Sequence, residues 1–269
     1  MSGQCVVTAA STSTVVSALA LRALAYQAGV PSAVWQVLHA QDPVVVSALS
    51  EHCDASTRAC CTPRTLQGSQ TRAGTFIVRH DAHLPAAVRH ALRCCFWAAG
   101  RPCTATPTLM VHARIHDEFM DRFTEAAARL PQHPLAHASA VFGALADAHQ
   151  MEDVRDYVRQ CAVLGGRVLH DGGQLPHVAP HMHGPVVIQS PTPELLPREV
   201  PPGPIAVVSG YRSWSDVLYR VREAGRHVTV HTTTSVGQLA PQFAGPPPRD
   251  LTLVRPWNRV PRRRPRASW

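Results

Sequence analysis

The chain contains no lysine, and all 26 of its basic Lys or Arg residues are arginines. No lysine can therefore form a Schiff base, ligate a phosphate or accept an acetyl group, and mechanisms that need one are excluded. Long apolar runs are also missing, since none approaches the roughly 18 residues that a membrane-spanning helix requires. We therefore expect no transmembrane segment. The N-terminus lacks a basic start followed by an apolar segment, so we expect neither a secretory signal nor a clear transit peptide.

Paired cysteine motifs are absent too. None of the eight cysteines shows CxxC spacing, and two pairs of neighbours, 60–61 and 94–95, have poor geometry for a mutual disulfide or a tetrahedral zinc site. We predict an intracellular protein in a reducing compartment, with cytoplasm and organelle matrix both open. We expect Cys94 and Cys95 to pack in the core, because they lie in an apolar stretch with little charge.

The chain is long, and its apolar residues follow helical and strand-like patterns. Its 269 residues are 45% hydrophobic, enough for one large domain or two small ones with a buried core. Helical and strand-like segments alternate, which favours an α/β fold with a largely parallel sheet. We expect helices at 15–28, 84–98, 115–130, 151–164 and 214–223. We expect strands at 34–39, 74–79, 108–111, 186–188, 205–208, 228–231 and 251–254.

The net charge of +8 is concentrated in the last fifteen residues. Segment 255–269 holds six arginines and no acid, which leaves 20 arginines against 18 acids in the rest of the chain. Three prolines interrupt this segment, so a regular helix is excluded and we expect an extended, solvated tail. The tail is either a solubilising end or a contact for RNA, anionic lipid or an acidic protein surface. The candidate anion- or partner-binding residues are Arg259, Arg262, Arg263, Arg264 and Arg266.

Six sequence blocks point to a known family. Residues 100–130 read GRPCTATPTLMVHARIHDEFMDRFTEAAARL. They resemble the aldehyde dehydrogenase signature, in which GQxC is followed by RxxVHxxIYDEFxxxL. Upstream, FIVRHDAHL resembles the family pattern IVxDDADL and places Asp81 at its acidic strand end. The blocks follow the family order from about residue 3 to 254, so the chain is identified as a truncated, degenerate member of the aldehyde dehydrogenase superfamily.

The resemblance implies the domain organisation. Residues 1–71 would form a partial, Rossmann-type dinucleotide-binding domain, and residues 72–254 a catalytic-like α/β domain with a mainly parallel sheet. Residues 255–269 would follow as the arginine- and proline-rich tail. We predict this organisation for the chain.

The resemblance also implies a reaction and the groups that it needs. In the family, a cysteine thiolate attacks an aldehyde, hydride passes to NAD(P), and a glutamate activates the water that hydrolyses the thioester. Here Ala9 and Thr12 stand at the lysine and glutamate that hold the adenosine ribose and phosphate. Pro63 falls in the phosphate loop, where it removes an N–H donor. No carboxylate occurs near 69–72 for the general base, and Val200 replaces the acid that grips the nicotinamide ribose.

The nucleophile position is the exception, because Cys103 matches it. Arg101 lies two residues away and could lower the pKa of this thiol. With the base and the cofactor ligands missing, we predict an idle thiol, no bound cofactor, and a catalytically inactive protein. It would act as a structural or accessory subunit with other protein chains, in a hetero- or homo-oligomer. The alternative is an NAD(P)-dependent aldehyde oxidoreductase, or a vestigial thiol enzyme, that uses Cys103.

Several histidines are candidate metal ligands. His177, His181 and His183 have H-x3-H-x-H spacing that could hold zinc or copper, yet Asp171 is the sole carboxylate nearby and no cysteine is close. We expect no metal there. His112 and His116 flank the turn into the signature helix, and we expect them to be surface residues.

Overall fold

The computed structural model divides the chain into two compact units, Met1–Thr71 and Arg72–Trp269. The structure describes residues 5–10, 14–39, 44–45, 48–49, 52, 74–101, 105–131, 143–145, 147–191, 200–224, 227–233 and 250–254. The nucleotide-binding and catalytic assignments of the two units stay predictions.

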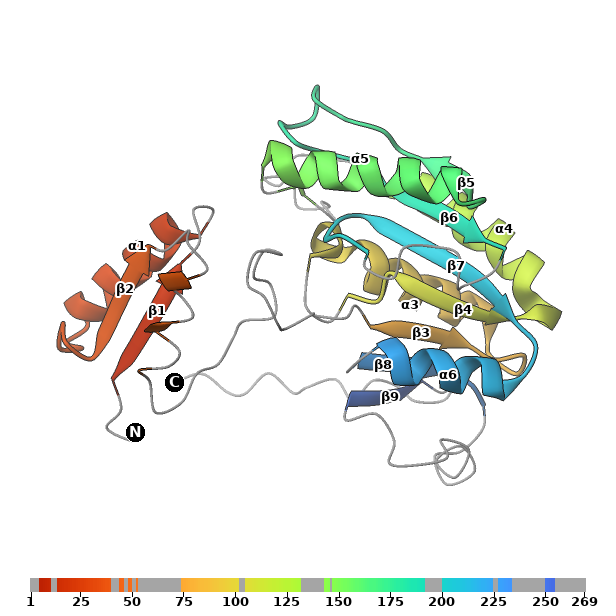
Figure 1. Cartoon of the computed structure of the whole chain (residues 1–269), viewed down its shortest axis with the longest axis horizontal. Helices are drawn as coiled ribbons and strands as arrows, with labels where there is room; N and C mark the ends of the chain where they lie inside the picture. Colours follow the sequence, from red (N-terminus) through yellow and green to blue (C-terminus); the bar gives the residue numbers. More distant parts are fainter. Residues whose placement is uncertain are drawn as a thin grey trace. The chain divides into compact units, whose positions relative to one another are not determined.

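In its described residues the N-terminal unit contains a strand–helix–strand motif (Figure 1). Strand β1 (Val6–Ala10) and strand β2 (Trp35–His39) pair in parallel, and helix α1 (Val15–Gln27) connects them. The chain leaves the helix through Gly29, which follows the C-cap residue Ala28 and whose φ of 91° is in the left-handed region that glycine adopts without strain. A parallel pair needs such a crossover, which explains the order of the elements.

The second unit is built on a seven-stranded sheet with the order β5-β6-β7-β4-β3-β8-β9. All neighbouring strands are parallel except β5, which pairs antiparallel with β6 at one edge. The strands are β3 (Thr75–Val78), β4 (Thr108–His112), β5 (Arg167–Asp171), β6 (Val186–Ser190), β7 (Ile205–Tyr211), β8 (His227–His231) and β9 (Asp250–Val254). This arrangement confirms the predicted α/β class with a mainly parallel sheet.

Helices cover both faces of this sheet (Figure 1). They are α3 (Leu84–Phe96), α4 (His116–Ala128), α5 (Ala148–Val163) and α6 (Trp214–Ala224), with short 3-10 turns η1 (Trp97–Gly100) and η2 (Ala113–Ile115). Successive strand residues face opposite sides of a sheet. Val208 accordingly lies in the core cluster with α3 and α4, whereas its neighbour Val207 lies in the cluster of α5. Ile77 and Met110 meet α6 on the face that Val207 occupies.

The expected elements are present with small changes at their ends, and two strands were not predicted. One is β1. The other is β5, whose pairing with β6 shifts register between Val168 and His170, so its side chains do not alternate regularly. The helix expected at 115–130 is preceded by η2, because the His112 side chain accepts a hydrogen bond from the backbone N–H of Arg114.

Within the described residues, no helix combines the length and apolar character that crossing a bilayer requires.

Candidate functional site

The segment that carries Cys103 connects the end of η1 to the start of β4. Cys103 itself lies outside the described residues, so its side chain has no described contacts; Arg101 and Ala105 on either side are described. Ala105, the first described residue after it, lies just before β4, which is parallel to β3 and β7.

The turn that leads into this segment has an unusual backbone. Ala98 and Ala99 have φ angles of 52° and 57°, and Gly100 follows at 66°. Left-handed conformations cost a non-glycine residue of order 1 kcal/mol or more, so other contacts must hold them. Arg101 supplies two, because its backbone N–H and its Nε both donate to the Ala98 carbonyl oxygen, at 3.4 and 3.3 Å. At Gly100 a Cβ atom would overlap the carbonyl oxygen of Gly203.

Two other cysteines border this connection and are structural. The Cys95 thiol is completely buried and donates to the Thr106 carbonyl oxygen at 3.2 Å, while the Thr106 N–H donates to the Cys94 carbonyl oxygen. Burial raises the pKa of both thiols. A thiolate is the reactive form, so neither is suited to be a nucleophile. The predicted core position is confirmed for Cys95, and Cys94 packs partly buried against the same cluster.

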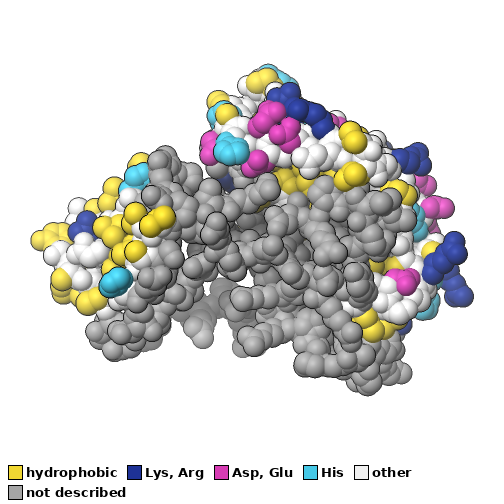
Figure 2. Space-filling model, in the orientation of Figure 1, with side chains coloured by type: hydrophobic (Ala, Val, Ile, Leu, Met, Phe, Trp, Pro, Cys, Tyr) yellow, Lys and Arg dark blue, Asp and Glu magenta, His cyan; other side chains and the backbone are white. Residues whose placement is uncertain are grey.

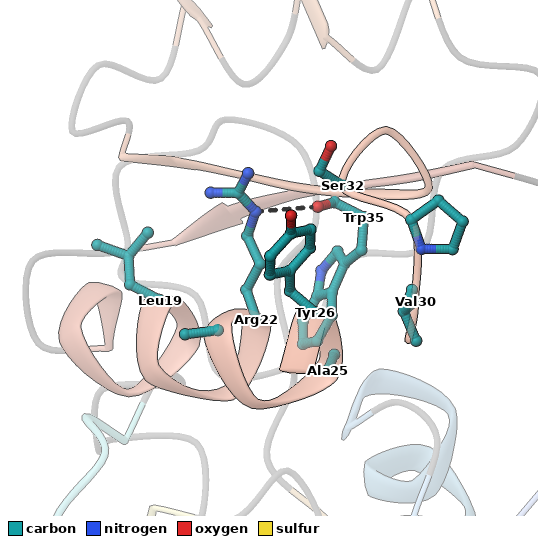
Figure 3. A pocket seen from close by; sticks show the side chains of 9 residues that line it. Leu19, Arg22, Ala25, Tyr26, Val30, Ser32 and Trp35 are labelled. Atoms are coloured by element: carbon teal, nitrogen blue, oxygen red, sulfur yellow. Dashed lines mark hydrogen bonds between the residues drawn. The ribbon is translucent and has the colours of Figure 1, made fainter. Parts of the chain in front are cut away.

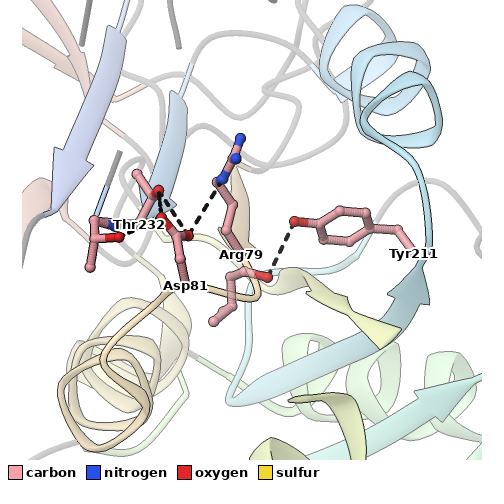
Figure 4. Close-up of polar contacts among 6 residues, drawn as sticks. Arg79, Asp81, Tyr211 and Thr232 are labelled. Carbon is pink, nitrogen blue, oxygen red and sulfur yellow. Dashed lines mark hydrogen bonds and ion pairs between the residues drawn. The ribbon is translucent and has the colours of Figure 1, made fainter. Parts of the chain in front are cut away.

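Asp81 lies at the carboxyl edge of the sheet, where it joins the ends of β3 and β8 (Figure 4). Its carboxylate accepts hydrogen bonds from the Thr232 hydroxyl at 2.8 Å and from the backbone and hydroxyl of Thr233 at 3.0 and 2.6 Å. Arg79 Nε lies 3.5 Å from the other oxygen. The neighbouring Tyr211 hydroxyl donates to the Val78 carbonyl oxygen at 3.3 Å. Through these bonds Asp81 links the ends of β3 and β8. Because its carboxylate oxygens are already engaged, Asp81 is poorly placed for acid–base chemistry.

The prediction that His112 and His116 are surface residues is borne out only in part, because both are partly buried. The His112 ring lies 5.0 Å from that of His80 and 5.3 Å from that of Tyr211, measured between centroids. The His116 side chain is 12% exposed and approaches the backbone of Gly210. His112 ends β4 at the carboxyl edge of the sheet, and His116 begins α4 just after the η2 turn, so their packing depends on the neighbouring strands and is not visible in the local sequence.

A partly buried pair of histidines was not predicted. His90 Nδ1 on α3 and His231 Nε2 on β8 share a hydrogen bond of 2.7 Å, with the Phe76 ring beside both. Burial, and then the neighbouring His90, lower the pKa of His231 to about 3. Burial and then the charge of Arg93 lower the pKa of His90. The partners are 141 residues apart, so no local motif could have indicated them.

The histidine-rich segment adopts a structural role where it is described. His183 is buried, its Nδ1 lies 2.8 Å from the Gly184 carbonyl oxygen, and its Nε2 is 3.9 Å from Asp171. His181 occupies a left-handed conformation with φ of 56°. In the described part of the chain, no three His, Cys, Asp or Glu side chains are grouped so that they could hold a metal ion.

The positions that the resemblance assigns to the cofactor are partly described. Ala9, at the lysine position, is an exposed residue of β1. Val200, at the position of the ribose-binding acid, packs against the core cluster of α5. Thr12, Pro63 and the segment 69–72 fall outside the described residues. So do the tail and its candidate residues Arg259, Arg262, Arg263, Arg264 and Arg266.

Comparison with known proteins identifies the family. The sequence model of the aldehyde dehydrogenase family matches residues 73–234, more than half of the chain. A putative succinate-semialdehyde dehydrogenase [NADP(+)] 2 of Mycobacterium tuberculosis is 27% identical over 208 residues, which are 72% of this chain and 40% of the relative. The succinate-semialdehyde dehydrogenase [NADP(+)] of Saccharomyces cerevisiae is 25% identical over 76% of this chain and 45% of its own.

Solved structures agree on the fold. PnpE in complex with nicotinamide adenine dinucleotide superposes with a TM-score of 0.80 at 23% identity, over 93% of this chain and 55% of that one. A putative aldehyde dehydrogenase from Burkholderia cenocepacia gives 0.76 at 21% identity, over 94% and 57%. The chain spans less than half the length of the two curated relatives named above. The chain belongs to the aldehyde dehydrogenase family.

Proposed function

We propose that this chain is a non-catalytic aldehyde dehydrogenase-like protein that serves as a structural or accessory subunit of a larger assembly. Two arguments support the proposal. One concerns the groups that an active member would use to hold NAD(P), and the other concerns an apolar surface that a partner would cover.

The cofactor argument rests on substitutions at matched positions. A methyl group at Ala9 cannot donate a hydrogen bond to ribose or phosphate, and no lysine elsewhere in the chain could do so. At Val200 an apolar side chain directed into the core replaces a carboxylate. Charge-assisted hydrogen bonds contribute about 1.5–3 kcal/mol each, so losing two or more costs at least about a hundredfold in affinity. We infer that the chain works without a bound dinucleotide.

The observation that best supports the subunit role is the exposure of helix α1, which has no buried residue. Leu21 and Leu24 are 56% and 60% exposed, and Val16 is 76% exposed. Figure 2 shows hydrophobic side chains gathered over this unit. Contiguous exposed apolar surface is typical of protein interfaces. A protein partner, either a second copy or another chain, would bury this surface.

The proposal also covers the arginine-rich tail, the cellular compartment and Cys103. The arginine tail would add contacts to an anionic surface of the assembly or to a polyanion. Free cysteines at four described positions are compatible with an intracellular, reducing compartment. Cys103 would remain an idle thiol.

Light scattering coupled to size-exclusion chromatography tests the subunit role. We expect the gently purified chain to elute in an assembly heavier than its own 29.2 kDa. Leu21→Gln combined with Leu24→Gln changes neighbouring positions of one helix face and should shift the mass toward the monomer. The control is Val163→Gln, an equally polar change at an 85% exposed valine of the second unit, which should leave the mass unchanged. A soluble wild-type monomer would contradict the subunit role.

One observation favours a second function. The signature around Cys103 is well preserved, and the curated relatives are named as NADP(+)-dependent succinate-semialdehyde dehydrogenases. An NAD(P)-dependent oxidoreductase using Cys103 would need another chain to supply the missing dinucleotide ligands and the general base. Measuring turnover distinguishes the two functions.

A further inference from the structure

The N-terminal unit contains a hollow between the C-terminal half of α1 and the turn into β2 (Figure 3). Its volume is about 250 Å³. It is lined by Leu19, Arg22, Ala23, Ala25, Tyr26, Val30, Pro31, Ser32 and Trp35. The lining is apolar and aromatic apart from the Arg22 guanidinium group and the hydroxyls of Ser32 and Tyr26, a composition typical of small-molecule sites.

Among the described residues, the Arg22 side chain makes one hydrogen bond in this hollow. Its Nε donates to the backbone carbonyl oxygen of Trp35 at 3.2 Å. Within the described part of the chain, the two terminal nitrogens of Arg22 donate to no protein acceptor, and no acidic side chain lines the hollow. A guanidinium held through Nε presents its terminal nitrogens as a pair of parallel donors, which is the geometry that a carboxylate accepts. The hollow is therefore equipped for an anion.

Two aromatic rings provide the remaining recognition surface. Tyr26 lies one helical turn from Arg22, and its ring and the Trp35 indole both line the hollow (Figure 3). The indole is fixed against β1, because its Nε1 donates to the Thr8 hydroxyl at 2.9 Å. Ordered aromatic faces bind planar apolar groups by stacking and edge contacts. The walls thus favour a flat ligand body.

The position of the hollow separates it from the edge where the resemblance predicts the dinucleotide. Trp35 begins β2 and is paired with Val6, the first residue of β1, so the hollow lies at the amino end of this pair. Ala9, at a matched cofactor position, lies near the carboxyl end. The volume is also too small for a dinucleotide, and suits a ligand of about one ring.

We propose that this hollow binds a small aromatic carboxylate. The carboxylate accepts two hydrogen bonds from the terminal nitrogens of Arg22, and the ring lies against Tyr26 and Trp35. The site requires neither Cys103 nor a dinucleotide, so it stands whether or not the subunit role is correct.

Calorimetric titration of the full chain with benzoate tests the site, with benzamide as the uncharged ligand of the same shape. Charge-assisted hydrogen bonds are roughly twice as strong as neutral ones, so benzamide should bind at least about tenfold more weakly than benzoate. Arg22→Gln should reduce benzoate affinity by the same factor and abolish the preference over benzamide. Arg129→Gln, on an exposed arginine that follows α4 and pairs with Glu125, is the matched control and should change neither affinity.

A second variant guards against misfolding of the first. Tyr26 is 64% exposed, so Tyr26→Ser should leave the fold intact while weakening both ligands together. Circular dichroism of each variant should match that of the wild type. The proposal is overturned if millimolar benzoate gives no binding heat with the wild type, since the hollow would then be a packing surface. Equal benzoate affinity in Arg22→Gln and wild type would also overturn it.

Discussion

At the scale of single residues, the second unit contains polar contacts made across long sequence separations. The hydrogen bonds of Asp81 join the end of β3 to the end of β8, and the His90–His231 hydrogen bond joins α3 to β8. Sequence singled out Asp81 through the family pattern, but its role follows only from Thr232 and Thr233. The pair of histidines could not be predicted, because β8 reaches its place beside β3 through the crossover that follows β7.

The histidine pair makes stability depend on pH. The pKa of His231 falls from an ordinary 6.5 to about 3 in the folded state. Between these values the unfolded chain binds a proton that the folded chain excludes, so the stabilising contribution is complete above pH 6.5 and is lost as the pH falls. We expect the free energy of unfolding to decrease by on the order of 2 kcal/mol between pH 7 and pH 5. Urea denaturation at several pH values measures it.

Two variants separate titration from packing. His231→Leu should flatten the decrease between pH 7 and pH 5, because the group that resists protonation is gone. Phe76→Leu changes the ring that packs on the pair without removing a titrating group, so its cost should be similar at both pH values. An unchanged pH dependence in His231→Leu would show that another group is responsible.

At the scale of elements, the local patterns predicted most helices and strands of the second unit because these are buried on regular faces. Helix α3, for example, presents Ala87, Ala91 and Phe96 to one cluster, and its expected start at Leu84 is observed. Strand β5 escaped prediction because its register shift and edge position remove the regular alternation. The left-handed turn η1 was also unpredictable, since Ala98 and Ala99 carry no local preference for that conformation.

Two glycines with left-handed backbones allow a test of the η1 turn. Gly165 has φ of 89° and no atom within 4 Å of the position that a Cβ would take, so Gly165→Ala should cost about 1 kcal/mol for conformation alone. Gly100→Ala would also drive a Cβ into the Gly203 carbonyl, and should cost at least about 3 kcal/mol. Chemical denaturation of both variants compares them. Equal costs would mean that Gly100 and Gly203 are not in close contact.

At the scale of the whole molecule, the sequence resemblance led to the correct family and fold, and the family match and the solved structures confirm both. The candidate site was predicted less completely. Cys103 and the tail arginines lie outside the described residues, so the roles assigned to them stay predictions. The hollow around Arg22 could have been noticed, because an arginine interrupts an otherwise uncharged helix 15–27, but its aromatic walls meet only through the fold.

Aldehyde oxidation by the purified chain tests the central claim most directly. The chain is mixed with succinate semialdehyde or a simple aldehyde and either NAD or NADP, and the absorbance of reduced nicotinamide is followed, with Cys103→Ala as the control. We predict no reduced nicotinamide above the Cys103→Ala background, because the ligands for the dinucleotide and the base for thioester hydrolysis are missing. Steady turnover that disappears in Cys103→Ala would contradict the account.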